Sequence, residues 1–218
     1  MSTLTGRFAF LVLATVFLAL PGAVFAAASQ GAITYLEGVV TIDAAPASIG
    51  DVVPSGATVK TDKDSLCEIT FRERNVIRLG EQTSLVFNPG NLQVGSVLRQ
   101  GSLTLVLKNL VSGSAGDHSF YVRTPTAAAG VRGTSFFMKV EDPSTTYVCL
   151  CNGVLRLDDG TLVKGMDIEA AHHDSYRVTD KDGSVSIDKA PMLYHTDQDM
   201  ETLAGKIGYT IDWTKVDR

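Results

Sequence analysis

Apolar and polar side chains alternate along most of the chain from Gly31 to Ile187. Short alternating runs rich in Val, Ile, Thr, Phe and Tyr predict β-strands with one buried face. Turn-forming Gly, Asn, Asp and Pro residues separate the runs. The pattern predicts an all-β sandwich, barrel or coiled sheet over residues 29–190. Strands are expected at 32–43, 67–71, 75–79, 84–87, 101–107, 119–124, 134–140, 146–157, 174–179 and 184–187.

The alternating strand pattern ends near residue 190, and the tail over 191–218 has a pattern typical of an α-helix. Thr196 with Asp199 three residues later is typical of a helix N-terminus, because each side chain can bond the other's backbone. Met200, Leu203 and Ile207 follow at helical spacing. We therefore expect one short helix that packs its apolar stripe on the β domain.

Residues 1–28 have the layout of a secretory signal peptide. Arg7 precedes an uninterrupted apolar run over 8–20, a helix break follows, and small residues suit a cut after Ala26 or Ala28. An uncleaved membrane anchor is the alternative. Because no later segment is apolar enough to span a bilayer, the body is expected to be periplasmic or secreted, without a membrane span once the signal is cleaved.

The bulk composition excludes some classes of function. The chain has 218 residues, 44% of them apolar, and a net charge of −5. Nucleic-acid binding usually needs a basic surface, so no nucleic-acid partner is expected. The sequence holds no nucleophile elbow, zinc-protease motif or phosphate loop, and we expect no enzymatic activity.

One stretch, "TPTAAAGVRGTSF" at 124–136, combines small residues with a single arginine between two predicted strands. Pro and Gly permit a tight corner between sheets, which Arg132 could pin through its five donors. The alternative is a recognition corner in which Arg132 reads an acidic group on a partner. The residues of that candidate binding site are Thr124, Pro125, Arg132, Gly133 and Thr134.

The segment "SFYVRTPTAAAGVRGTSFFMKV" resembles the signature of the FecR-type domain, with T-P followed by V-R-G-T between hydrophobic strands. Upstream, "GAITYLEGVVTI" and "GSVLRQGSLTLVL" resemble other strands of that family. The resemblance covers residues 31–157. It implies an exported all-β domain, solenoid-like or sandwich-like, here followed by the short C-terminal helix.

The best-known members of the FecR family are periplasmic parts of membrane regulators that report on iron-siderophore receptors and also hold a sigma factor in the cytoplasm. Only seven residues precede the apolar run here. The chain therefore resembles a stand-alone exported member without its own anti-sigma segment. The resemblance implies a non-enzymatic signalling module that needs no cofactor and binds an envelope protein or a cell-wall component.

Cysteines and histidines suggest a second function. Cys149 and Cys151 would stand on the same face of a strand, because strand side chains alternate. They could be small core residues, a strained disulfide, a redox dithiol or two ligands of a Zn or Cu ion. His172 and His173 would point to opposite faces, so only one could readily join them, and His195 is a further candidate. The alternative function is therefore a metal-binding or metal-sensing β domain.

Overall fold

The structure, a computed structural model, describes residues 30–90, 95–108, 120–131, 133–159 and 165–217. The expected signal peptide lies outside these residues. Within them, sixteen strands form one hydrogen-bonded network and a single α-helix follows. The expected all-β fold with a short C-terminal helix is confirmed. No helix in the described part of the chain is long and apolar enough to cross a membrane.

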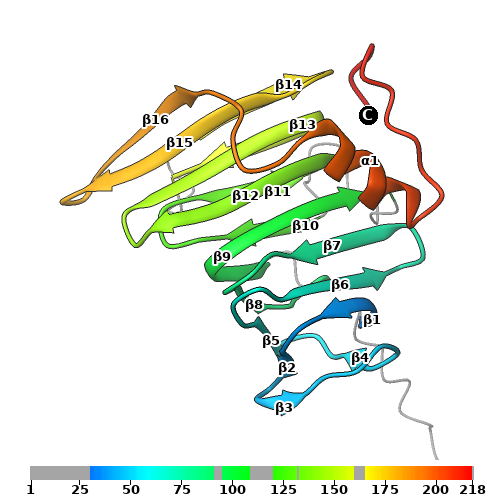
Figure 1. Cartoon of the computed structure of the whole chain (residues 1–218). Helices are drawn as coiled ribbons and strands as arrows, with labels where there is room; N and C mark the ends of the chain where they lie inside the picture. Colours follow the sequence, from blue (N-terminus) through cyan, green and yellow to red (C-terminus); the bar gives the residue numbers. More distant parts are fainter. Residues whose placement is uncertain (1–29, 91–94, 109–119, 132, 160–164, 218) are drawn as a thin grey trace, which may run out of the picture.

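The strands lie one above another in a twisted, tapering stack, roughly in the order of the sequence (Figure 1). Their bounds are β1 (Gly31–Glu37), β2 (Val40–Ile42), β3 (Ala45–Pro46), β4 (Val52–Val53), β5 (Thr58–Thr61), β6 (Leu66–Phe71), β7 (Asn75–Leu79), β8 (Ser84–Val86), β9 (Ser96–Leu107), β10 (Phe120–Arg123), β11 (Ala128–Val131), β12 (Ser135–Asp142), β13 (Thr145–Asp158), β14 (Gly165–Ala170), β15 (Asp174–Lys181) and β16 (Ser184–Ala190).

The strands form two layers of sheet. The long strands β9 and β13 each contribute one half to each layer. The front sheet contains β1, β4, β6, β7, β12, β15 and β16, together with one half each of β9 and β13. The back sheet contains β2, β3, β5, β8, β10, β11 and β14, together with the other halves. This arrangement gives the fold both solenoid-like and sandwich-like character.

Glycines mark the points where these two strands pass from one layer to the other. Gly101 in β9 has φ 84° and Gly153 in β13 has φ 120°. A Cβ at Gly101 would lie 2.5 Å from the Cα of Thr83, and one at Gly153 would lie 3.0 Å from the carbonyl oxygen of Gly133. Both positions therefore need the positive φ and the missing side chain of glycine.

The main core lies between the two sheets, and a smaller apolar cluster lies on the outer face of the front sheet. Neighbouring strand residues divide between them: Ile77 and Leu105 join the main core, whereas Val76 and Val106 join the outer cluster. This division follows from the alternation of strand side chains. The outer face is apolar because the C-terminal tail covers it.

The helix α1 (Asp197–Gly205) begins where the sequence predicts. Thr196 is its N-cap and forms a reciprocal capping box with Asp199. Met200 and Leu203 are fully buried against the outer cluster, and the partly buried Ile207 follows. The tail thus packs on the β domain through the expected stripe.

Candidate metal centre

Cys149 and Cys151 lie side by side on the outer face of β13 and are fully buried. Their period-2 spacing places both thiols on one face, as the sequence predicts. Their Sγ atoms are 3.9 Å apart, and the thiol of Cys151 donates a hydrogen bond to the sulfur of Cys149. All three cysteines, including Cys67, are free thiols.

The turn between β14 and β15 brings His173 to these thiols. The residue adopts φ 38°, and its backbone N–H donates to the Cys151 carbonyl oxygen. Its Nδ1 lies 3.3 Å from the Sγ of Cys149, and its Nε2 lies 2.7 Å from an oxygen of Asp197. Because an ionised carboxylate can only accept a hydrogen bond, Asp197 favours the tautomer of His173 with the proton on Nε2. The Nδ1 atom of the ring is then directed at the Cys149 sulfur.

His195 approaches from the tail, two residues before α1. Its Nε2 lies 3.3 Å from the Sγ of Cys151. Its Nδ1 donates to the carbonyl oxygen of Leu193 at 2.9 Å, so Nε2 of the neutral ring keeps its lone pair. The ring stacks on Phe137 with a centroid distance of 4.7 Å. Packing and hydrogen bonding therefore fix the orientation of this imidazole.

The surroundings shift the pKa values of the two thiols in opposite directions. The hydrogen bond from Cys151 lowers the pKa of the Cys149 thiol, aided by the imidazole of His173 and opposed by burial. Burial raises the pKa of Cys151. Burial disfavours a charged His173 ring, but its hydrogen bonds to Cys149 and Asp197 outweigh this effect and raise its pKa. Of the two thiols, Cys149 is therefore the one more easily converted to the thiolate, which is the form of cysteine that binds metals.

Three of the six distances among four candidate donor atoms are close to those of a tetrahedral metal site. The thiols of Cys149 and Cys151 and the ring nitrogens of His173 and His195 all lie within 4.8 Å of one another. Around a Zn²⁺ ion with ordinary bond lengths, tetrahedral sulfurs would be about 3.8 Å apart, and a sulfur and a nitrogen about 3.5 Å apart. The observed 3.9 Å and 3.3 Å separations are close to these values.

His172 lies on the exposed side of the same turn. Its Nε2 is 3.0 Å from the second oxygen of Asp197. His172, His173 and Asp197 also form a compact group, but His173 is shared with the cysteine cluster. Of the two adjacent histidines, the structure thus directs only His173 to the thiols. Asp197 is not a candidate from the sequence, because an acidic residue directly after the N-cap is typical of a helix start.

Two residues of the candidate recognition corner, Thr124 and Thr134, form hydrogen bonds within the domain. Thr124 is buried, and its hydroxyl lies 2.8 Å from that of Thr146. Thr134 is buried and donates to the Val154 carbonyl oxygen at 2.6 Å. Pro125 is exposed, and Gly133 is half-buried with φ 62°. Arg132 lies outside the described residues.

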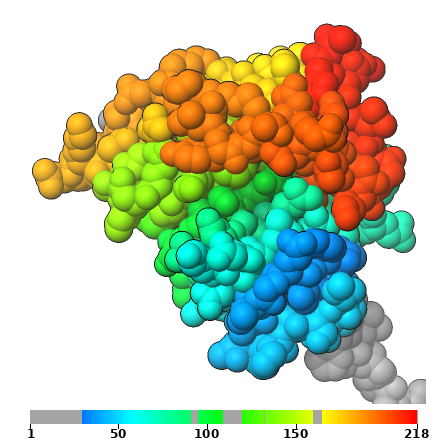
Figure 2. Space-filling view, in the orientation of Figure 1, coloured from blue at the N-terminus to red at the C-terminus, as the bar shows by residue number. Residues whose placement is uncertain are grey.

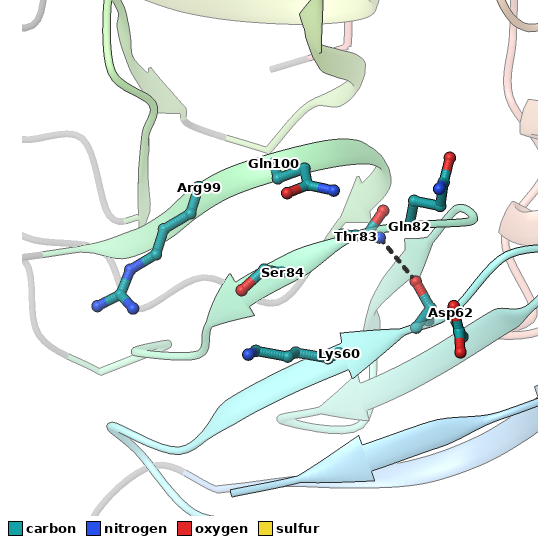
Figure 3. Close-up of a pocket in the computed structure, with 8 residues that line it drawn as sticks. Lys60, Asp62, Gln82, Thr83, Ser84, Arg99 and Gln100 are labelled. Carbon is teal, nitrogen blue, oxygen red and sulfur yellow. Dashed lines mark hydrogen bonds between the residues drawn. The ribbon is translucent and has the colours of Figure 1, made fainter. Parts of the chain in front are cut away.

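A polar groove lies far from the cysteine cluster, on the back sheet. Lys60 on β5 and Arg99 on β9 extend along it (Figure 3). The groove contains about 400 Å³, but both cations are exposed, and the Thr61 hydroxyl is used to accept a hydrogen bond from the Thr83 backbone. Its side chains therefore form an open surface, whereas those of the cysteine cluster converge on a point.

Comparisons with known proteins agree with the family indicated by the sequence. Residues 57–156 match the family described as FecR protein. No curated protein matches the chain significantly. Two crystal structures of a candidate anti-sigma factor from Parabacteroides distasonis ATCC 8503, at 1.65 Å and 2.50 Å resolution, are similar in structure, each with a TM-score of 0.46. They are 16% and 15% identical in sequence, and each match covers 61% of this chain but only 59% of the solved one.

Proposed function

This chain carries a FecR domain at residues 57–156, and on that premise we propose that it is a non-enzymatic signalling module that binds one zinc-class metal ion. The ligands are Cys149, Cys151, His173 and His195. The observation that supports this function best is the convergence of two thiols and two imidazole nitrogens within 4.8 Å.

Zinc is the ion that fits this donor set most simply. Two sulfur and two nitrogen donors in tetrahedral positions are typical of structural Zn²⁺ sites. The hydrogen bonds from His173 to Asp197 and from His195 to the Leu193 carbonyl are the outer contacts that orient metal-binding imidazoles. Cu(I), which also prefers thiolates, is the principal competitor.

A four-ligand site suits a regulatory protein better than an enzyme. Catalytic zinc usually has three protein ligands and keeps one position open for water or substrate. Here four protein donors would complete the tetrahedron, and both cysteines are fully buried. The ion would therefore stabilise a conformation or report on metal supply, and it would not activate a substrate.

We place this activity outside the cytoplasm. The secretory-type sequence at residues 1–28 and the FecR domain support export to the periplasm or beyond. The macromolecular partner of the module would be an envelope protein or a cell-wall component. Metal occupancy would then be the signal that the module conveys to that partner.

The first test is the metal content of the full-length protein purified without chelator, measured by elemental mass spectrometry. We expect one zinc per chain, and loss of the stoichiometric metal in Cys149→Ser and Cys151→Ser. The matched control is Cys67→Ser, which changes a buried free thiol in the main core and should keep the metal. Protein that binds no ion when supplied with Zn²⁺, or that retains it in both site variants, would refute the proposal.

A further inference from the structure

The C-terminal tail over residues 191–217 lies across the outer face of the front sheet. Figure 2 shows its orange and red residues over the green strands. Met200, Leu203 and Ala204 are fully buried there, and Ile211 nearly so. The strand residues in the same cluster include Val76, Val106, Phe137 and Tyr147.

The candidate metal ligands come from both sides of this contact. Cys149, Cys151 and His173 belong to the β domain, whereas His195 belongs to the tail. Asp197, the first residue of α1, bonds the ring of His173 across the same boundary. An ion held by the four ligands would therefore connect the tail directly to the sheet.

The end of the tail also covers the site. Trp213 stacks on the ring of His173 with a centroid distance of 5.3 Å, and its Nε1 donates to Glu201 of α1. Asn152, next to Cys151, donates to the carbonyl oxygens of Asp212 and Lys215. The end of the tail would therefore have to move before an ion could reach the buried thiols from the side that it covers.

The helix depends on the sheet for its own order. α1 spans nine residues, and isolated helices shorter than about 12 residues are marginal in water. Its backbone hydrogen bonds should therefore be protected from solvent only while the tail is docked. Amide exchange in α1 is thus a direct measure of docking.

We infer that the metal ion latches the tail onto the front sheet, so that metal binding and tail docking stabilise each other. The inference rests on the proposed metal function and adds what the ion controls. In the latched state the tail itself occupies the apolar sheet face. Release of the ion weakens docking and uncovers that face. Because the two equilibria are linked, each must change the other by the same factor.

Hydrogen exchange on the full-length protein tests the latch, with zinc-loaded and chelator-treated samples compared. We expect amides of Met200 to Lys206 to exchange at least tenfold faster after chelation. Amides of β5, in the back sheet between β2 and β8, should exchange at unchanged rates. The single tryptophan of the chain, Trp213, gives an independent readout, because opening removes it from the His173 ring and changes its fluorescence.

The reverse effect is tested with Leu203→Ala, which loosens tail packing without removing a ligand. We expect zinc affinity, measured by competition with a chromophoric chelator, to fall by the factor by which the docked fraction of the zinc-free protein falls, and α1 exchange measures that fraction. Leu85→Ala is the matched control, because Leu85 is equally buried but belongs to the main core. That control should leave zinc affinity unchanged.

The outcomes separate the latch from the metal site. Protein that binds no zinc would refute both the proposed function and the latch. Zinc bound at full stoichiometry with identical α1 exchange in the two samples would overturn the latch alone. An unchanged zinc affinity in Leu203→Ala, when α1 exchange shows that the tail of the zinc-free variant is mostly undocked, would also overturn it.

Discussion

Asp197 holds the two adjacent histidine rings at once, one on each carboxylate oxygen. Its bond to His173 is 2.7 Å and its bond to His172 is 3.0 Å. The His173 bond aims Nδ1 at Cys149, because it occupies the other ring nitrogen. A carboxylate in this position also increases the basicity of the imidazole, which strengthens its bond to a metal.

Replacement of this carboxylate tests its effect on the metal site. Asp197→Asn keeps the shape of the side chain but removes its charge, so we expect zinc affinity to fall by about 10–100-fold. The capping box of Thr196 and Asp199 remains in place to start the helix. Competition with a chromophoric chelator measures the change. Asp188→Asn, an exposed aspartate on β16, is the control, and equal affinity in both variants would contradict the role of Asp197.

Part of this site is predictable from local sequence pattern. The spacing of Cys149 and Cys151 placed both thiols on one face, because strand alternation is a local rule. By the same rule, only one of His172 and His173 can lie on the face of the two thiols, but the rule does not identify which of the two histidines it is. The choice depends on the turn at His173, with φ 38°. The approach of His195 depends on the path of the tail, which no local pattern encodes.

Among the elements, β13 determines the geometry of the site. Its first half belongs to the front sheet and carries both cysteines, and its second half belongs to the back sheet. Gly153 lies at the change of layer, with φ 120°. The strand can therefore display the thiols on the outer face and then turn to pair with β11 and β14.

A side chain at this bend should destabilise the fold. Gly153→Ala would place a methyl group 3.0 Å from a backbone oxygen in a conformation that glycine favours, at a cost of about 1–3 kcal/mol. Urea unfolding measures the loss. Gly205→Ala at the end of α1 meets no heavy atom within 4 Å and should be neutral or slightly stabilising. A Gly153→Ala protein as stable as the parent would contradict the role of the bend.

The strands that sequence reasoning found are those with β-branched and aromatic residues, such as β7, whose bounds match the expected 75–79. The strand β11, with the sequence AAGV, was not among the expected runs. Alanine and glycine have weak strand preference, so β11 forms because β10 and β13 pair with it on both sides. The helix start was predictable, because capping is local chemistry.

At the scale of the whole molecule, the candidate metal centre joins two parts of the chain with different structure. The β domain supplies three donor atoms, and the tail supplies the fourth after the last strand. The apolar outer cluster and the ion would act together on the same contact. A metal ion bound at this boundary, as proposed, would convert metal supply into a change of the exposed surface.

X-ray absorption at the zinc edge of the full-length, zinc-loaded protein identifies the atoms that bind the ion. We expect two sulfur neighbours at about 2.3 Å and two nitrogen neighbours at about 2.0–2.1 Å. Cys149→Ser should lose one sulfur neighbour, whereas Cys67→Ser should give the parent spectrum. A first shell of oxygen and nitrogen alone, or no bound zinc at all, would contradict the assignment of Cys149, Cys151, His173 and His195 as a metal centre.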